Sequence, residues 1–252
     1  MKLITLNAWG GRVWPELKNF IESRKNEIDI FCFQEIYKQN QNSQAFVQVS
    51  GREVKYDLFE QIRNSLENHN YEFCDVLEER YGIATYINKK IEILEKGDIL
   101  IAKGNWEESN DIENRDHDRK LQWFDLLVKG SRLRIMNTHF THRPKGKSDS
   151  EKRLNQSKIL VDLVESFDGP QIIVGDFNLL PNTQSIQMLE HIGLKNLIKE
   201  YNIISTRTEL YKKTLKFADY IFCSPEIIIK DFKVLADVVS DHNPLYLEFD
   251  LI

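Results

Sequence analysis

Five short polar motifs follow apolar segments of the chain and together offer carboxylate, amide and imidazole groups. They are Leu6-Asn7, Phe33-Gln34-Glu35, Asn137-Thr138-His139, Gly175-Asp176-Phe177-Asn178 and Val239-Ser240-Asp241-His242. A strand fixes the backbone while the loop after it leaves a side chain free to point at a ligand, so sites in layered α/β folds are built at strand ends. A histidine that directly follows an aspartate in the sequence can bind a metal ion or a phosphate group. We therefore expect a site for phosphate chemistry at the ends of these strands.

The chain resembles the endonuclease/exonuclease/phosphatase superfamily, which includes pancreatic deoxyribonuclease, apurinic endonucleases, inositol polyphosphate phosphatases and neutral sphingomyelinases. The resemblance runs from Leu3 to Phe249. It rests on six groups in the family's order: Asn7, Glu35, His139, Asp176-x-Asn178, Asp219 and Asp241-His242. Each motif is short enough to arise by chance, whereas six in order at plausible separations are not. The resemblance implies a metal-dependent phosphoesterase.

The resemblance implies a metal site made of Glu35 as principal ligand, with Asn7 and Asp241 beside it. Oxygen donors of this kind suit Mg²⁺ or Mn²⁺, whereas zinc prefers histidine or cysteine. Taken alone, a glutamate after a strand is usually a surface residue or a helix cap. The glycines after Asn7 would by themselves indicate an ordinary tight turn. They are not a P-loop, because the Gly-Lys-Ser/Thr element is absent.

The catalytic roles also follow from the resemblance. Asp176 would orient or deprotonate the attacking water, and Asn178 would hold both the nucleophile and the phosphate. Without the resemblance, an Asp-x-Asn after a buried strand is ordinary turn chemistry. His242 would donate to a non-bridging phosphate oxygen, and Asp219 would pair with this histidine and favour its protonated state.

His139 and several basic residues complete the predicted site. His139 would contact phosphate or act as the leaving-group acid, and Glu79 would support it and raise its proton affinity. The segment from Arg143 through Lys145 to Lys147 is normally a solvated basic loop, but its closeness to His139 makes it the best candidate for a grip on substrate phosphates. Further substrate-binding candidates, each of which is also an ordinary surface residue on its own, are Arg207 and Arg12.

The substrate class is less well determined than the reaction, because members of the superfamily act on DNA, RNA, phosphoinositides, sphingomyelin and protein–DNA linkages. The sequence has no obvious membrane-inserting hairpin, which disfavours lipids. We expect hydrolysis of phosphodiesters in nucleic acid or nucleotides by direct attack of water. The alternatives are a phosphatase for small phosphomonoesters and a non-catalytic binding module on the same fold.

Composition predicts one domain over residues 1–252, since 252 residues that are 41% hydrophobic can bury a large core. The first apolar run begins within two residues of Met1, and no run approaches the ~20 residues of a membrane span. A soluble, cytoplasmic monomer is therefore expected. The three cysteines, among them Cys32 and Cys223 in apolar strands, are interpreted as structural. A net charge of -5 argues against a generally basic surface but permits a local basic rim.

Hydrophobic periodicity predicts helices and strands that would form two sheets covered by helices. The resemblance implies the same α/β architecture, a four-layer α-β-β-α sandwich. Loops are expected at 35–50 and 104–120, and a hairpin connection at 129–131. Helices are expected at 15–26, 56–69, 149–167 and 184–192. Strands are expected at 2–6, 29–34, 71–76, 81–87, 92–94, 99–102, 121–128, 132–140, 171–174, 217–223, 227–235 and 245–249.

Overall fold

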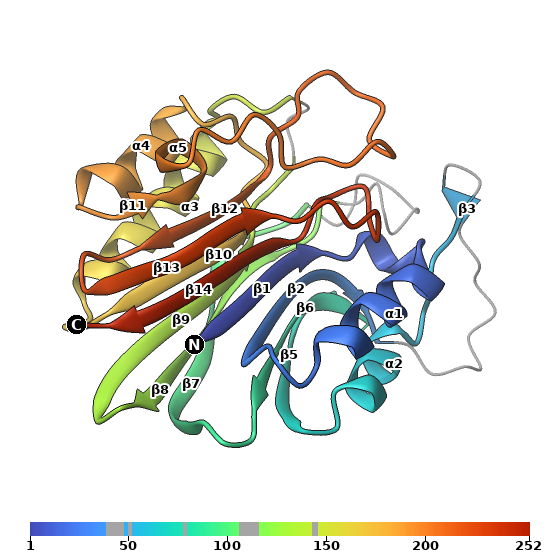
Figure 1. The fold of residues 1–252 in the computed structure, drawn as a ribbon. Coiled ribbons are helices and arrows are strands. Elements are labelled where there is room, and N and C mark those ends of the chain that lie inside the picture. The colour runs from blue at the N-terminus through green and yellow to red at the C-terminus, as the bar shows by residue number, and fades with distance from the viewer. Residues whose placement is uncertain (39–47, 50–51, 78–79, 106–115, 143–145) are drawn as a thin grey trace.

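Two six-stranded mixed sheets pack face to face in a computed structural model that describes residues 1–38, 48–49, 52–77, 80–105, 116–142 and 146–252 (Figure 1). The first sheet has the order β13 (Ile227–Val234), β14 (Leu245–Leu251), β1 (Lys2–Asn7), β2 (Ile30–Tyr37), β6 (Tyr81–Asn88), β5 (His69–Leu77). The second has the order β11 (Lys195–Asn196), β12 (Asp219–Cys223), β10 (Gln171–Asp176), β9 (Ser131–His139), β8 (Arg119–Val128), β7 (Glu92–Ala102). A separate short pair consists of β3 (Gln48–Val49) and β4 (Arg52–Glu53).

Helices cover the outer face of each sheet, which confirms the predicted four-layer sandwich. The first sheet carries α1 (Trp14–Arg24) and α2 (Leu58–Ser65), and the second carries α3 (Glu151–Glu165), α4 (Gln184–His191) and α5 (Leu197–Glu200) (Figure 1). Successive strand side chains point to opposite faces, so β2 directs Phe31 and Phe33 to α1 and α2, and Cys32 to the second sheet. The cysteines Cys32, Cys74 and Cys223 are buried and free.

Local sequence signals account for several element boundaries. Pro15 lies in the first turn of α1, where its fixed φ fits and its missing N–H is not needed. Ser150 caps α3 by accepting a hydrogen bond from the backbone nitrogen of Arg153. Lys129 and Gly130 both have positive φ and form the two-residue turn between β8 and β9. Among the helices that the structure describes, none is long and apolar enough to cross a membrane.

Several elements differ from the sequence-based prediction. The strands predicted at 92–94 and 99–102 are one strand, β7, which lies at a sheet edge and has two register shifts. Edge strands tolerate charged residues such as those between the two predicted pieces. The helix predicted at 56–69 ends at Ser65, so that His69 begins β5. Short β11 and α5 were not predicted. Of the loop predicted at 35–50, residues 35–37 belong to β2 and residues 48–49 form β3, whereas residues 39–47 and 50 lie outside the described residues. Of the loop predicted at 104–120, residues 119–120 begin β8, whereas residues 106–115 lie outside the described residues.

A buried hydrogen-bond network joins the two sheets at their centre. Gln34 Nε2 in β2 donates to Asn137 Oδ1 in β9 at 2.8 Å and to Thr5 Oγ1 at 3.1 Å. Asn137 Nδ2 approaches Thr85 Oγ1 at 3.2 Å and two main-chain carbonyls of the first sheet. Thr85 in turn donates to Gln122 Oε1 at 2.7 Å. Hydrogen bonds in such a buried network are directional, so they specify how one sheet is placed on the other.

Replacing Asn137 by alanine is expected to destabilise the fold because it leaves several buried groups without partners. Each such group costs about 1–3 kcal/mol, so the loss should exceed about 2 kcal/mol. The measurement is the free energy of unfolding in urea. Asn70, exposed on β5, is the matched control, and Asn70→Ala should change stability by less than about 0.5 kcal/mol. Equal losses in the two variants would contradict a role of the network in joining the sheets.

Candidate active site

The predicted site residues from both sheets meet at one end of the sandwich. Asn7 ends β1, Asp176 ends β10, and parallel pairing of β9 with β10 places His139 opposite Asp176. Asn7 Nδ2 donates to Glu35 Oε1 and to Asp176 Oδ2, each at 2.9 Å. This one amide therefore links the carboxylate of the first sheet to that of the second.

Glu35 lies at an irregularity of β2 that turns its side chain toward the site. The pairing of β2 with β6 shifts register between Phe33 and Ile36, and Glu35 has a φ of 58°. Positive φ is uncommon for a residue with a Cβ, and such strain is concentrated at functional sites. In a regular strand Glu35 would point to the same side as Phe33, toward the helices. The bulge instead lets its carboxylate reach Asn7.

Close packing of two neighbouring strands explains the glycine of the Gly-Asp-x-Asn motif. A Cβ on Gly175 would lie 1.9 Å from the carbonyl oxygen of Thr138, so β10 approaches β9 closely only with glycine here. Asp176 Oδ1 then accepts a hydrogen bond from the backbone nitrogen of Asn178 at 2.8 Å. Asn178 Nδ2 lies 3.3 Å from His139 Nε2, so the motif brings the carboxylate and the amide to this imidazole.

His242 and Asp219 form a buried pair, as the resemblance predicted. His242 Nδ1 lies 2.8 and 2.9 Å from the two carboxylate oxygens of Asp219, which also accepts from Thr206 Oγ1 at 2.8 Å. His242 Nε2 faces the cluster, 3.7 Å from Asp176 Oδ2. Burial and Arg207 act to lower the pKa of His242, but the carboxylates around it outweigh them and raise this pKa above its ordinary value. The imidazole therefore tends to carry a proton.

The charge states of Asp176 and His139 are set by their surroundings. Burial acts to raise the pKa of Asp176, but His242, His139, Arg207 and Lys147 together hold it well below its ordinary value. Burial, followed by the charge of Arg119, lowers the pKa of His139 well below its ordinary value. This direction is opposite to the raised proton affinity expected from support by Glu79, a residue that lies outside the described part of the chain.

The carboxylates of the site fit a divalent cation with oxygen ligands. Asp241 Oδ2 accepts from Arg207 Nη1 at 2.8 Å, whereas the buried Asp241 Oδ1 has no hydrogen-bond partner among the described residues. Burial, and then the charges of Asp241 and Asp176, act to raise the pKa of Glu35 above its ordinary value. Clustered carboxylates with an unused buried oxygen are what a hard cation neutralises. Ligand atoms of Glu35, His139 and Asp176 lie within 4.8 Å of one another.

Asn7 is placed next to this cluster, but its oxygen is engaged elsewhere. Asn7 Oδ1 accepts from the backbone nitrogen of Trp9 at 3.0 Å, while Nδ2 faces the carboxylates of Glu35 and Asp176. In this arrangement Asn7 orients the two carboxylates. Its role as a metal ligand stays a prediction.

Two of the four predicted substrate-binding residues line a cavity at the site. The side chain of Arg207 is 5% exposed and lies over the ring of Tyr211 at 4.2 Å. Arg12 is also buried, donates to the carbonyl of Trp9 at 2.8 Å and lies over its ring. The other two, Arg143 and Lys145, lie outside the described residues.

The cavity has a volume of about 800 Å³ and contains residues that sequence reasoning did not single out. Arg119, at the start of β8, is 2% exposed, and its Nη2 lies 3.2 Å from His142 Nδ1. Lys147 belonged to the predicted basic loop but is buried rather than solvated. No sequence signal marks a lone cation as buried. Aromatic side chains complete the wall: Trp9, Tyr37, Tyr81 and Tyr211.

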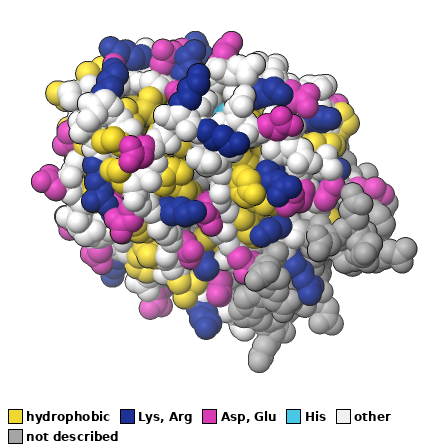
Figure 2. Space-filling view, turned by 90° about the horizontal axis from the view of Figure 1, so that it is seen from below, with side chains coloured by type: hydrophobic (Ala, Val, Ile, Leu, Met, Phe, Trp, Pro, Cys, Tyr) yellow, Lys and Arg dark blue, Asp and Glu magenta, His cyan; other side chains and the backbone are white. Residues whose placement is uncertain are grey.

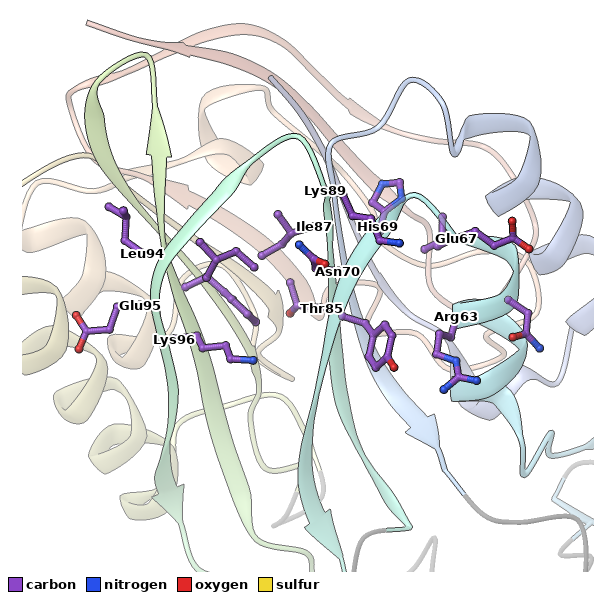
Figure 3. A pocket seen from close by; sticks show the side chains of 15 residues that line it. Arg63, Glu67, His69, Asn70, Thr85, Ile87, Lys89, Leu94, Glu95 and Lys96 are labelled. Atoms are coloured by element: carbon purple, nitrogen blue, oxygen red, sulfur yellow. The ribbon is translucent and has the colours of Figure 1, made fainter.

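A second cavity of about 810 Å³ lies between the outer strands of the two sheets, away from these residues (Figure 3). Its lining includes Leu94, Glu95 and Lys96 of β7, and Thr85 and Ile87 of β6. None of the predicted site residues that the structure describes lines it. Cavity size therefore does not locate the chemistry, whereas the convergence of charged groups does.

Comparison with known proteins agrees with this fold. The mannosyl-6-phosphatase Bt3783 of Bacteroides thetaiotaomicron superposes with a TM-score of 0.73 at 18% identity, covering 100% of both chains. The catalytic domain of human nocturnin superposes with a TM-score of 0.70 at 17% identity, covering 100% of this chain and 93% of that domain. A UPF0294 protein of Yersinia pseudotuberculosis is 31% identical over 121 residues, which are 48% of this chain and only 44% of that relative. Residues 4–242 match the endonuclease/exonuclease/phosphatase family, and the chain belongs to that family.

Proposed function

We propose that the protein is a Mg²⁺- or Mn²⁺-dependent hydrolase that cleaves phosphoester bonds by direct attack of water. The observation that carries this proposal is the contact of Asn7 with both Glu35 and Asp176, because it gathers carboxylates from two sheets beside the Nε2 atom of His242. A carboxylate cluster holds a cation, and an adjacent protonated imidazole stabilises a phosphoryl oxygen.

Glu35 and Asp241 would hold the ion, next to Asn7. When bound, the ion supplies charge that polarises the phosphoryl group and makes water easier to deprotonate. Asp176 accepts a hydrogen bond from the attacking water and orients it. Because the pKa of Asp176 is held low, this residue stays a carboxylate and acts more by positioning than as a strong base.

His242 donates from Nε2 to a non-bridging phosphoryl oxygen, and Asp219 holds the ring through Nδ1. Asn178, whose side chain lies next to His139, would contact the same phosphate. His139, with its lowered pKa, is mainly neutral, which suits a hydrogen bond to phosphate better than proton donation to the leaving group. We therefore assign His139 to phosphate contact.

The cavity favours a small substrate. About 800 Å³ lies within the range of small-molecule pockets. The net charge is -5, and on the face seen from below in Figure 2 the basic and acidic side chains of the described residues are interspersed. Long nucleic acids are bound mainly through extended cationic surfaces. We propose that the substrate is a nucleotide or a comparable small phosphoester rather than a long nucleic acid.

The alternative to an enzyme is a non-catalytic binding module with the same fold. The convergence of charged residues at one end of the sandwich supports an enzyme, because a module without activity has no need to keep them. Hydrolysis of bis(p-nitrophenyl) phosphate and p-nitrophenyl phosphate, measured with and without Mg²⁺, separates the two possibilities.

Removal of divalent cations is expected to abolish hydrolysis, and Mg²⁺ or Mn²⁺ should restore it, because the ion would polarise the phosphoryl group and make the attacking water easier to deprotonate. Added Mn²⁺ should also raise the thermal unfolding midpoint of the parent protein, since a ligand that binds the folded state stabilises it. Glu35→Gln should reduce this shift, with the exposed Glu92→Gln of β7 as the matched control. Full activity after exhaustive chelation would refute the metal assignment.

Asp176→Asn is expected to lose rate far more than substrate affinity, because the amide still forms hydrogen bonds but no longer offers an anionic acceptor to the water. The decrease in kcat should be at least ~100-fold, the lower end for this kind of catalysis. Steady-state kinetics on the better of the two nitrophenyl substrates gives both constants. A variant within a few-fold of the parent would remove Asp176 from the mechanism.

A further inference from the structure

Lys147 presents an unsatisfied ammonium group to the active-site cavity. The residue is 7% exposed and lines the cavity. Its Nζ atom is buried without a hydrogen-bond partner, and no ion pair joins it to a carboxylate among the residues that the structure describes. The ring of Tyr211, 5.8 Å away, is its neighbour on one side. A buried ammonium without an acceptor is unfavourable, so the position indicates a ligand that supplies one.

The backbone around Lys147 is fixed, which gives the ammonium a defined position. The carbonyl of Lys147 accepts from the backbone nitrogen of Leu180 at 2.8 Å. The guanidinium of Arg153 is buried below the loop and donates to three carbonyls at 2.6–3.1 Å, those of Thr141, Gly146 and Ser148. A charged group held in this way is suited to specific recognition.

Lys147 lines the same cavity as Asp176, Asp241 and His242. Burial lowers its pKa to about 8, Arg207 acts in the same direction, and the carboxylates of Asp176, Asp219 and Asp241 act against them. The amine is thus mainly protonated at neutral pH. A bound anion would favour this protonated form.

Positive groups outnumber the carboxylates, and a divalent ion would add to this excess. The cationic groups in the described part of the cavity are Arg12, Arg119, Lys147, Arg207, Lys213 and protonated His242. They face the carboxylates of Glu35, Asp176 and Asp241, and that of Asp219 behind His242. A phosphomonoester carries about 1.5 to 2 negative charges at neutral pH, as a phosphorylated side chain does. A phosphodiester carries one and therefore leaves more of the positive charge unmatched.

We propose that Lys147, together with Arg207, binds the terminal oxygens of a phosphomonoester, so that Lys147 determines specificity for dianionic phosphate. This inference rests on the proposed function and narrows its substrate class. In the reaction, the water oxygen bonds to phosphorus as the ester P–O bond breaks. The leaving oxygen takes up a proton from the water, which gives an alcohol and inorganic phosphate.

The experiment compares p-nitrophenyl phosphate with bis(p-nitrophenyl) phosphate in the metal-loaded parent protein, Lys147→Met and Lys147→Arg. Lys158→Met, on the exposed side of α3, is the matched control. Lys147→Met should lower kcat/KM for the monoester by about 10- to 100-fold, the range for loss of a charged hydrogen bond, and for the diester by less than about threefold. Lys147→Arg should recover part of the loss, and Lys158→Met should resemble the parent.

Binding provides a second readout that does not depend on turnover, and its first comparison uses the parent protein alone. Inorganic phosphate should raise the thermal midpoint of the parent protein more than the monoanion dimethyl phosphate at equal concentration, and this difference should shrink in Lys147→Met. Equal losses for both esters, or an equal effect of both anions on the parent, would overturn the role of Lys147. Hydrolysis of the diester without hydrolysis of the monoester would also overturn the role of Lys147, but the proposed function would still stand. Hydrolysis of neither ester would instead overturn the proposed function.

Discussion

The hydrogen bond between Gln34 and Asn137 is the contact on which the rest of the site depends, because it fixes one sheet against the other. Gln34 directly precedes Glu35, and Asn137 lies two residues before His139. Glu35 and His139, which belong to the two halves of the site, therefore each lie close in the chain to one partner of this buried hydrogen bond. An apolar interface would allow several placements of one sheet on the other, whereas paired amides favour one. The same interaction that specifies the sandwich therefore sets the separation of the reacting groups.

The second constraint on the structure is the set of buried charged groups in the site. The site gathers carboxylates around Asn7 and a group of buried cations. Among the described residues, four buried polar atoms of these groups have no hydrogen-bond partner: Arg119 Nε, Lys147 Nζ, Arg207 Nε and the carboxylate atom Asp241 Oδ1. Such groups destabilise the fold unless ligands satisfy them. Their concentration around one cavity indicates that substrate and cation complete the electrostatics. The second cavity, between the outer strands, has no comparable set of buried carboxylates.

The sequence predicted the sandwich and the carboxylate, amide and imidazole groups of the candidate site. Both the fold and these groups produce local patterns in the sequence. Apolar runs mark strands, and polar residues at their ends mark the site. It did not identify Arg119 as part of the cavity wall or Lys147 as buried, because burial of a cation depends on segments distant in the chain, such as the contact of Lys147 with Leu180. It also split β7, since charged residues on an edge strand resemble a loop. The lowered pKa of His139 likewise arises from burial and from the charge of Arg119, and not from any motif.

The left-handed backbone of Glu35 has a consequence for how this chain can change over time. A non-glycine residue in this conformation costs about 1–3 kcal/mol, and glycine would relieve most of it. Mutational drift toward a more stable protein therefore leads away from the glutamate, and only selection for activity keeps it. In copies of the gene released from that selection, position 35 should be among the first to become glycine or asparagine. Retention of the glutamate among close relatives would accordingly be a sign that chemistry is still under selection.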